Sequence, residues 1–396
     1  MALGDDAVDV DFDVDQLDGA ADPYGLFAGL RAAGPMVRTP SGFLVTTTWP
    51  AAMDVLRSPD ATSGMIGQRY RDVLPPGAAR DELSHRINFL DPPDHPRVRS
   101  LVSKAFTPRR VTALRPFVEQ TTERLLDELV EQGSFDLLHD LAHQVPSLVI
   151  SELLGVPVED RDRLTALSDE VTPLLGISVD PDDKVRAVAA AEEMHEALGA
   201  LLVERQASPG DDLLSALLLA EEDGERLSRP ELLSLAATLY SAGHRTTRDS
   251  TVNGMSVLLR GEGQPGRTVA STVQEMLRVE TPTLYVARLL PAGPVLILLG
   301  SANHDEGTYD DADRFRPERW SAEPPPPGPL SFAFGAHYCL GASLARMEAE
   351  VMVDALLARP LVLDLPDGEE LHWRLRGPFR SLESLPVRVD AAAGAG

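Results

Sequence analysis

The chain has 396 residues, of which 43% are hydrophobic and 25% are charged, and a chain of this kind is able to bury a large core. Its net charge of −26 disfavours nucleic acid as a partner, because a phosphate backbone would be repelled. There is no run of about 18 uncharged apolar residues and no signal-peptide pattern, and the single cysteine excludes an internal disulfide. We therefore expect a cytoplasmic protein that does not span a membrane.

Residues 97–110, RVRSLVSKAFTPRR, are basic within an otherwise acidic chain. They carry five basic side chains and no acidic one. Such a run is either a solvated helix face or a surface that binds an anion or a docking partner, and the pattern alone does not separate these interpretations.

Apolar residues spaced three and four apart dominate residues 100–260 and predict a mainly helical region. Thr107 and Pro108 begin one helix, which ends at Gly133. A second helical run over 135–154 is followed by Gly155 and Pro157, a typical stop.

A long helix is predicted to begin at Ser228, which forms a capping box with Glu231. The apolar pattern continues to about Leu259, so this helix is roughly 45 Å long. A helix of that length usually runs buried through the middle of a large α domain.

Strand patterns are few and occur at residues 42–47, 294–300 and 385–390, whereas the proline-rich 324–329 is expected to be extended and irregular. No internal repeat or linker is visible. The sequence therefore predicts one mainly helical domain over residues 1–396, with a small β part.

The stretch SFAFGAHYCLGASLAR (331–346) contains Cys339, the chain's one cysteine. Helical periodicity over 340–358 places it at a helix N-terminus, where free N–H groups and the helix dipole favour a thiolate. Gly335 and Gly341 bracket it and allow the close approach of a flat ligand. These residues alone leave four roles open for Cys339: a nucleophile, a redox thiol, a metal ligand or a buried apolar side chain.

His139 and His143 lie four residues apart, a spacing that metal ligands use on a helix. The glutamate of a zinc-protease helix is missing and no third ligand is evident. We expect ordinary helix histidines here.

The cysteine stretch resembles the haem-binding loop of the cytochrome P450 haem-thiolate monooxygenases, in which the cysteine is the axial ligand of haem b. The matching residues are Phe332, Gly335, His337, Cys339 and Gly341, while Ala333 stands where that family usually has glycine. The resemblance implies a single-domain cytochrome P450 fold, with the haem between the long central helix and the helix that follows the Cys loop.

Further landmarks of that family occur in the expected order. Glu275, Arg278 and Arg319 resemble its buried charged triad. The resemblance also implies four contacts to the haem propionates, because charged and imidazole donors pair well with buried carboxylates: His95, Arg99, Arg288 and His337.

SAGHRTTRDST (241–251) resembles the family's oxygen-binding groove, with Ala242 and Gly243 as small groove residues and Thr246 as the hydroxyl that hydrogen-bonds dioxygen. Arg245 stands where the family has an acid that delivers protons, and arginine does not release a proton near neutral pH. Three hypotheses follow: protons arrive through water or Asp249, the chemistry differs, or Arg245 binds a substrate carboxylate.

A second departure follows Arg288. About a dozen residues that usually form a small hairpin in the family are missing before the segment Pro291–Gly293. We expect a less covered pocket, which would suit a bulky substrate or one tethered to an acyl or peptidyl carrier protein.

The resemblance implies a monomeric monooxygenase that oxidises a small organic substrate, aromatic or polyketide-like, in bacterial secondary metabolism. Electrons would come from a ferredoxin and its reductase, and Arg109 and Arg110 are the candidates for docking the ferredoxin. By family analogy the substrate pocket would include Met65, Ile66, Leu174, Leu175, Tyr285, Phe379 and Arg380. The alternative is a haem-thiolate enzyme of another class, which couples, dehydrates or uses peroxide.

Overall fold

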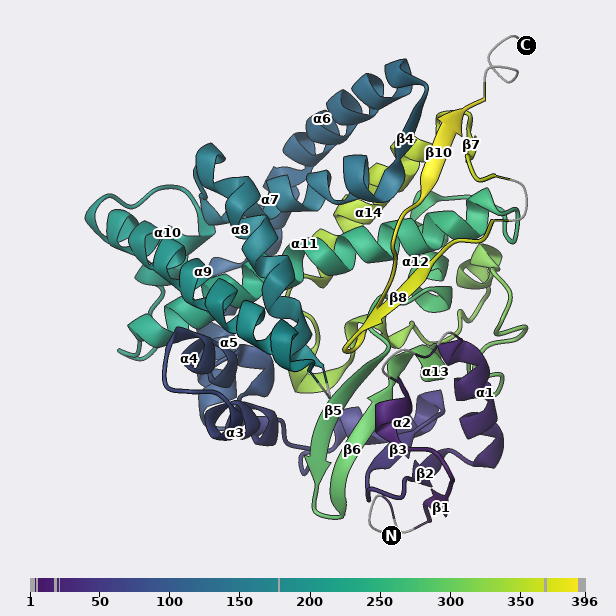
Figure 1. Ribbon diagram of the computed structural model, residues 1–396, viewed down its shortest axis with the longest axis horizontal. Helices are drawn as coiled ribbons and strands as arrows, with labels where there is room; N and C mark the ends of the chain where they lie inside the picture. Colours follow the sequence, from purple (N-terminus) through teal and green to yellow (C-terminus); the bar gives the residue numbers. More distant parts are fainter. Residues whose placement is uncertain are drawn as a thin grey trace. The chain divides into compact units, whose positions relative to one another are not determined.

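The structure is a computed structural model that describes residues 4, 6–17, 20, 22–176, 179–366 and 369–390 (Figure 1). Two compact units can be distinguished within it, and each is described by itself. The mixed unit comprises residues 1–61, 115–146 and 246–396, and the helical unit comprises residues 62–114 and 147–245. The prediction of a single domain over 1–396 stays a prediction.

The mixed unit contains all the named strands of the described chain. Five of them form one sheet in the order β1–β2–β3–β6–β5, with the bounds Val8–Asp9, Met36–Arg38, Leu44–Thr46, Gly293–Leu298 and Tyr285–Leu290. A three-stranded sheet has the order β4–β10–β7, with bounds Ser134–Asp136, Pro386–Val389 and Leu361–Leu363, and β8 (Trp373–Arg376) pairs with β9 (Phe379–Leu382). The predicted strands at 42–47, 294–300 and 385–390 are confirmed as β3, β6 and β10.

Helices of the mixed unit are α1 (Pro23–Ala33), α2 (Trp49–Arg57), α12 (Val269–Val279), α13 (Leu299–Asn303) and α14 (Ala342–Leu357). Short 3-10 turns are η1 (Val14–Leu17), η5 (Pro317–Ser321), η6 (Leu330–Phe332) and η7 (Gly335–His337), and η3 (Leu137–Ala142) is a π-helical turn. A core of buried apolar residues joins the large sheet to α2 and includes Leu44, Val55, Val295 and Ile297.

The segment after Arg288 is a tight hairpin rather than an open end. β5 and β6 pair antiparallel from Tyr285 opposite Leu298 to Leu290 opposite Gly293, and Pro291 and Ala292 alone make the turn. Figure 1 shows the two strands of this hairpin as adjacent green arrows, with β5 at the edge of the large sheet. Two residues thus suffice to connect the paired strands β5 and β6.

The helical unit consists of helices in the described residues. They are α3 (Gly64–Val73), α4 (Ala78–Ser84), η2 (Ile87–Phe89), α5 (Asp94–Ala105), α8 (Val158–Val171), η4 (Thr172–Leu175), α9 (Pro181–Ala207) and α10 (Leu213–Leu219), with most of α7 (Gln144–Leu154). A buried cluster packs α3, α4, α8 and α9 together and includes Tyr70, Leu83, Val171 and Ala187.

Two helices continue from one unit into the other: α6 (Pro108–Gln132) and α11 (Arg229–Leu259). Their predicted starts are confirmed. Thr107 Oγ1 accepts a bond from the Arg110 amide at 3.3 Å, and the Ser228 amide donates to Glu231 Oε2 at 2.7 Å. With 31 residues, α11 matches the predicted length.

The predicted helix over 135–154 begins later than its sequence pattern suggested. Phe135 and Asp136 belong to β4, and the π-helical turn precedes α7. The reason is tertiary, because Phe135 pairs with Val387 of β10. No single helix in the described part of the chain is long and apolar enough to cross a membrane.

Candidate active site

Cys339 lies in the short loop between η7 and α14 of the mixed unit. The loop is fixed by its own backbone, since the Cys339 amide donates to the Phe332 carbonyl at 3.1 Å and the Tyr338 amide donates to the Gly335 carbonyl at 3.0 Å. The cysteine is exposed, although cysteine is among the most frequently buried residue types. The interpretation of Cys339 as a buried apolar side chain is therefore wrong.

Gly335 is required by both its conformation and its surroundings. Its φ is +76°, and a Cβ at this position would lie 2.5 Å from the carbonyl oxygen of Leu56 on α2. Ala333 has φ +55° and ψ −155°, close to a region that glycine occupies almost alone. This backbone conformation explains why the family usually has glycine at the position of Ala333, and alanine is strained there.

An arginine that the sequence analysis missed supports the loop from α14. The Arg346 guanidinium lies 4.5 Å from the centre of the Phe332 ring, and its Nη1 donates to the Tyr338 hydroxyl at 3.1 Å. Its position seven residues after Cys339, two helical turns into the predicted helix, was the signal that could have found it. Through Phe332 and Tyr338, Arg346 therefore stabilises the loop that contains Cys339.

The donor set around Cys339 fits a haem. Its thiol is exposed and lies three residues before the first turn of the 16-residue helix α14. The aromatic ring of Phe332 is half-buried, and no acidic residue occurs between 331 and 341. An N-terminal helix end stabilises a thiolate, and thiolates are haem ligands.

Two predicted propionate contacts also belong to the mixed unit. Arg288 is buried on β5, and its Nη1 donates to the carbonyl of Ala287 at 2.7 Å. His337 is half-buried in η7. The structure therefore places Arg288 and His337 in the unit that carries Cys339, and their roles toward propionates stay predictions.

The predicted charged triad is confirmed. Arg278 donates to both carboxylate oxygens of Glu275, at 2.7 and 3.1 Å, and Arg319 Nε donates to Glu275 Oε1 at 3.0 Å. Glu275 and Arg278 are fully buried, and burial lowers the pKa of Arg319 from its ordinary value. Trp320 adds an indole donor to the same carboxylate at 3.0 Å.

A chain of hydrogen bonds leads from the triad to the Cys loop. Arg278 Nη1 donates to the Asn303 carbonyl at 2.8 Å. The Asn303 side chain accepts from the Leu330 amide at 2.7 Å and donates to Ser331 Oγ at 3.0 Å. Asn303, which the sequence analysis did not single out, thus ties the start of the loop to the buried triad.

The helical unit carries the other predicted contacts. His95 and Arg99 lie four residues apart on α5, and His95 is buried while Arg99 is half-buried. This spacing places the two side chains on one face of the helix, as predicted. Their roles toward a propionate stay predictions.

Gly243 and Ala242, the two small residues of the predicted groove on α11, lie in different surroundings. A Cβ on Gly243 would lie 2.8 Å from Ile150 Cδ1, so close packing against α7 explains this glycine. Ala242 is exposed and Thr246 half-exposed one turn later, although 244, 245 and 247–249 are buried. Ala242 and Thr246 thus mark the accessible face of the helix.

Arg245 does not face solvent. It is buried, and its Nη1 lies 3.5 Å from Asp169 Oδ1 on α8. His244 Nε2 lies at the same distance from that oxygen. The guanidinium beside the groove is therefore compensated by a carboxylate.

Asp249, the sequence candidate for a proton route, is fully buried in the mixed unit. Its Oδ1 accepts from Arg248 Nε at 2.7 Å, and Arg248 Nη1 lies 3.4 Å from His143 Nδ1. His139 Nε2 instead lies 3.0 Å from the Glu383 carbonyl. The two histidines thus have separate partners, and no group of three metal-binding side chains occurs among the described residues.

Two of the residues predicted to line the substrate pocket have structural roles. Arg380 is buried, pairs with Glu280 and lies 3.4 Å from the centre of the Trp373 ring, so its charge is compensated. Leu174 is buried in the core of the helical unit, and its carbonyl accepts from the Tyr70 hydroxyl at 2.8 Å. That Arg380 also contacts a substrate stays a prediction.

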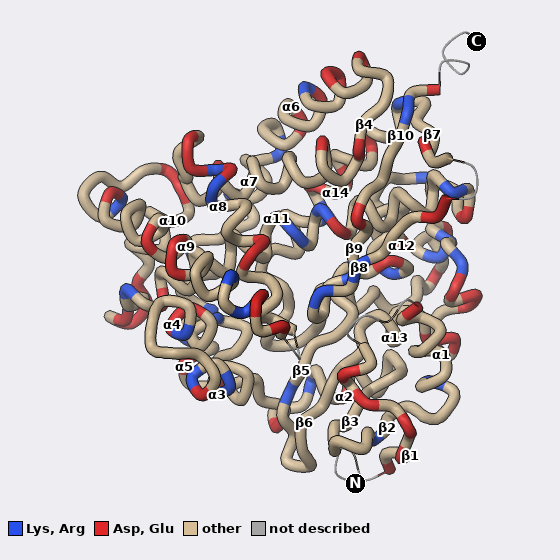
Figure 2. The backbone as a smooth tube through the Cα atoms, viewed as in Figure 1, with Lys and Arg blue, Asp and Glu red and all other residues tan. Residues whose placement is uncertain are grey.

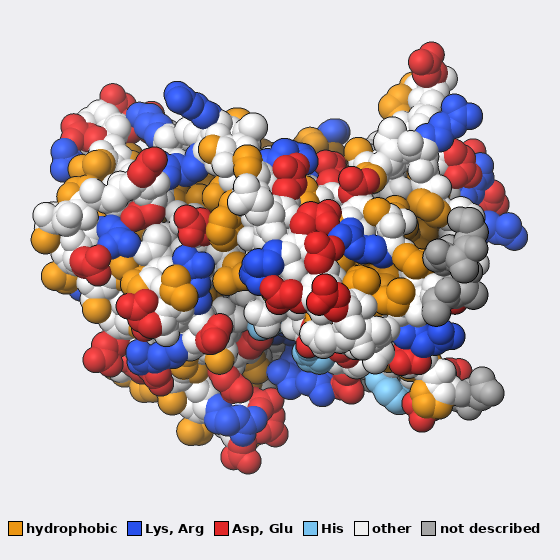
Figure 3. Space-filling model, turned by 90° about the horizontal axis from the view of Figure 1, so that it is seen from above, with side chains coloured by type: hydrophobic (Ala, Val, Ile, Leu, Met, Phe, Trp, Pro, Cys, Tyr) orange, Lys and Arg blue, Asp and Glu red, His pale blue; other side chains and the backbone are white. Residues whose placement is uncertain are grey.

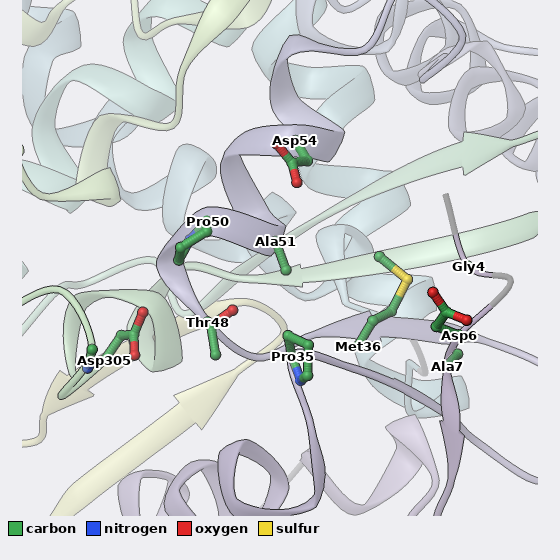
Figure 4. Close-up of a pocket in the computed structure, with 11 residues that line it drawn as sticks. Gly4, Asp6, Ala7, Pro35, Met36, Thr48, Pro50, Ala51, Asp54 and Asp305 are labelled. Atoms are coloured by element: carbon green, nitrogen blue, oxygen red, sulfur yellow. Dashed lines mark hydrogen bonds between the residues drawn. The ribbon is translucent and has the colours of Figure 1, made fainter. Parts of the chain in front are cut away.

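A hollow of about 500 Å³ in the mixed unit is a separate feature (Figure 4). It is lined by residues of the N-terminal segment, β2, the start of α2 and residues 305–307, and none is a predicted site residue. The Asp305 carboxylate accepts from the amides of Trp49 and Gly307, each at 3.0 Å. This acid is therefore part of the scaffold.

The basic stretch 97–110 is largely neutralised within the helical unit. Arg97 pairs with Glu231 and Glu225, and Lys104 lies 3.3 Å from Glu222. Arg110 Nη1 donates to the Asp211 carbonyl at 3.0 Å, whereas Arg109 is exposed and has no recorded ion pair among the described residues. Acidic segments accompany the basic ones around α5 (Figure 2), and both signs are interspersed on the face in Figure 3.

Comparison with known proteins gives the family. The cytochrome P450 family model matches residues 273–371, which include the triad glutamate and Cys339. Cytochrome P450 monooxygenase PikC of Streptomyces venezuelae is 38% identical over 408 residues, covering 96% of this chain and 94% of the relative. The polyketide biosynthesis cytochrome P450 PksS of Bacillus subtilis is 34% identical over 332 residues, covering 78% of this chain and 79% of the relative.

Among solved structures, P450BioI in complex with an acyl carrier protein that bears hexadec-9Z-enoic acid has a TM-score of 0.83 at 27% identity. The alignment covers 95% of this chain and 99% of that one. This similarity confirms the predicted mainly α fold with a small β part. The chain belongs to the cytochrome P450 family of monooxygenases, whose cofactor is haem with an axial cysteine thiolate, and Cys339 is its single cysteine.

Proposed function

We propose that this protein inserts one oxygen atom into a small, largely apolar substrate of bacterial secondary metabolism, with Cys339 as the haem ligand. The exposed position of Cys339 ahead of α14 is the observation that carries the proposal. The name of the relative PksS, which assigns that protein to polyketide biosynthesis, supports a polyketide-like substrate.

The side chains that the family resemblance singled out would hold the cofactor. His95, Arg99, Arg288 and His337 would pair with the propionates, because charged and imidazole donors compensate buried carboxylates. Phe332, Gly341, Ala242 and Gly243 would border the porphyrin. When bound, the haem supplies an iron whose thiolate ligand favours cleavage of the O–O bond. Thr246, half-exposed on α11, would hold a proton at its hydroxyl for the oxygen site.

The compensation of Arg245 and Arg380 favours a neutral substrate over an acid. The two arginines that the family analogy places at the substrate pocket or the groove are compensated, Arg245 by Asp169 and Arg380 by Glu280. A carboxylate would have to displace a carboxylate already in place, and breaking a buried pair is costly. A neutral ketone, ester or thioester requires no such exchange.

A carrier-bound substrate is the finer form of this proposal. A thioester on an acyl carrier protein is neutral at the reacting end, and the P450BioI structure shows a relative of this fold with such a carrier. The short β5–β6 turn at Pro291 and Ala292 is compatible with a bulky or tethered substrate. Binding of an acyl carrier protein with and without its acyl chain, measured by calorimetry, tests it; equal absence of binding in both cases would overturn it.

Two electrons per turnover would come from a reduced ferredoxin. Arg109 fits this role best in the basic stretch, because the charges of Arg97, Lys104 and Arg110 are shared with acids. Phe334, five residues before Cys339 in the mixed unit, is exposed, and the Arg57 guanidinium lies 5.0 Å from the centre of its ring. Arg109→Glu should raise the KM for ferredoxin at low ionic strength and leave peroxide-driven turnover unchanged.

The central test uses the carbon monoxide complex of the reduced holoprotein. The parent should show the strongly red-shifted Soret band that a thiolate ligand produces, and Cys339→Ala should lose it. Turnover under labelled dioxygen then separates the two candidate classes, because a monooxygenase places label in the product. Unlabelled product from an active enzyme would favour the alternative of oxidative coupling, dehydration or peroxide-driven oxidation.

A further inference from the structure

Two segments that the family analogy places at the substrate pocket, 283–285 and 377–382, are paired with each other in the mixed unit. An antiparallel bridge joins Thr283 to Phe379, and backbone hydrogen bonds of 2.8 and 2.9 Å flank it. Phe379 is half-buried and is the first residue of β9. The position of its ring therefore depends on what holds β9 in place.

Beyond this bridge, a side chain of α11 binds the same edge of β9. Asn253 Nδ2 donates to the carbonyl of Arg380 at 2.9 Å, and Asn253 Oδ1 accepts a longer bond, of 3.4 Å, from the amide of Leu382. These are the backbone groups that an adjoining strand would bind. The carboxamide of Asn253 therefore replaces a strand at the point where the segment around Thr283 ends.

We propose that Asn253 is a positioning residue of the substrate pocket, which holds Phe379 in place through β9 and thereby determines which substrates fit. The inference rests on the proposed function, because that function requires the pocket. It adds a residue that the sequence analysis did not single out. Asn253, β9 and Thr283 all belong to the mixed unit.

The requirements of α11 itself do not explain an asparagine at this position. The Asn253 side chain is fully buried, and asparagine forms helices less readily than leucine or methionine does. A buried carboxamide is costly unless it is hydrogen-bonded. In the described part of the chain, the recorded side-chain bonds of Asn253 go to β9 and none goes to α11. The contact with β9 therefore accounts for this residue.

Other contacts of β9 fix it to the neighbouring segment rather than to α11. The buried Arg380 side chain pairs with Glu280, which directly precedes residues 281–284. Its guanidinium also lies 3.4 Å from the centre of the Trp373 ring and 5.0 Å from that of Tyr24. Without the Asn253 carboxamide, the two paired segments should thus stay together and shift relative to α11.

The anchor point lies on the same face of α11 as the proposed oxygen-site hydroxyl. Asn253 follows Thr246 by seven residues, which is about two helical turns. Side chains at this spacing start from one face of a helix. A shift of β9 relative to Asn253 is therefore a shift relative to the face of α11 that carries Thr246.

The test compares Asn253→Ala with Ser256→Ala in the ferric holoprotein. Ser256 is also fully buried on α11, but its hydroxyl donates to the carbonyl of Asn253 at 2.7 Å and so bonds within the helix. Imidazole and phenylimidazole are the probes. Both bind haem iron through a ring nitrogen, whereas only the second extends a phenyl ring into the pocket. The shift of the Soret band gives the Kd of each.

The ratio of the two Kd values reports on the pocket wall. In Asn253→Ala the Kd of phenylimidazole should rise roughly fivefold to tenfold relative to that of imidazole, because the bonds that hold β9 are lost. Ser256→Ala should keep the parent's ratio. A general loss of stability would weaken both probes alike and leave the ratio unchanged. An unchanged or lower ratio in Asn253→Ala would overturn the inference.

A double-mutant cycle with Phe379→Ala tests whether Asn253 acts through Phe379. Once the Phe379 ring is removed, Asn253→Ala should change the ratio by less than about twofold, because the ring that it positions is gone. Effects of the two changes that multiply independently would contradict the proposed role.

Asn253→Gln carries the same comparison if Asn253→Ala does not retain haem. It keeps both hydrogen-bonding groups but moves them outward by one methylene, so the ratio should rise less than in Asn253→Ala. A parental ratio would again count against the inference. Failure of the proposed function looks different, since the parent would then leave no label in its product, whereas the two probes require only bound haem.

Discussion

In the Cys loop, residues that follow one another along the chain also contact one another, as the bond from the Cys339 amide to the Phe332 carbonyl shows. Around Arg245 the decisive contact comes from Asp169 on a different helix. The first region carries a recognisable motif because its geometry is local. The second departs from the family pattern at position 245, and the charge of Arg245 is compensated by a residue of another helix. A motif reports a function reliably only where its contacts are local.

The two regions also place a carboxylate in different surroundings. Asp169 in the helical unit is partly exposed and faces a guanidinium and an imidazole. Glu348 on α14, the helix behind Cys339, is 1% exposed, and its Oε2 has no hydrogen-bond partner. Burial alone raises the pKa of the Glu348 carboxyl well above its ordinary value. Opposite charge surrounds the first acid, whereas the second has only burial and retains its proton to higher pH.

The largest expected effect breaks the support of the Cys loop. Arg278→Met would leave Glu275 buried without its main partner and should lower the free energy of unfolding by about 3–5 kcal/mol. Haem affinity should also fall, because Asn303 links the triad to Leu330 and Ser331. Arg316→Met, whose side chain pairs with Asp311 and Glu318 at the surface, is the control and should cost less than about 1 kcal/mol. Equal urea midpoints for the two variants would contradict the role of the triad.

A second variant, Glu348→Gln, tests whether burial raises the pKa of the Glu348 carboxyl. Above pH 4.5 the glutamate at 348 is ionised in the unfolded chain but protonated in the folded one. The unfolded state then binds fewer protons, so the free energy of unfolding should fall by about 1.4 kcal/mol per pH unit, up to the folded-state pKa. Glu348→Gln should remove this contribution, and its advantage over the parent should grow with pH.

Urea unfolding of the holoprotein at several pH values above 4.5 measures this slope. Glu350→Gln, on the same helix beside Arg115, is the control and should keep the parent's pH dependence. Parallel curves for the parent and Glu348→Gln would show that the carboxyl at 348 is ionised in the folded protein.

The smallest expected effect concerns the turn ahead of the cysteine. Ala333→Gly should raise the free energy of unfolding by about 1 kcal/mol, because glycine adopts φ +55° and ψ −155° without a clash at Cβ. The matched change Ala336→Gly, at a residue of η7 with no recorded positive φ, should instead lower it by about 0.5–1 kcal/mol. The opposite signs are measured by thermal unfolding, and a loss of stability in both would contradict the strain at Ala333.

Much of the fold followed from local patterns. The capping box of Ser228 and Glu231 gave the start of α11, and Thr107 with Pro108 gave the start of α6, because caps satisfy backbone groups within a few residues. The π-helical turn at Leu137–Ala142 did not follow, because the pairing of Phe135 with β10 decides where the helix begins.

The sequence by itself determined the haem loop, the long helix and the Glu275–Arg278 pair, since each rests on residues that a short stretch of chain or a helix turn brings together; Arg319, 44 residues after Glu275, was found only through the family resemblance. Only the tertiary structure decided which charges remain uncompensated. It paired Arg380 with Glu280, Arg245 with Asp169, and most of the basic stretch 97–110 with acids of other helices. The physical reason is that compensation of a charge depends on distance in space, and a list of residues contains no such distance.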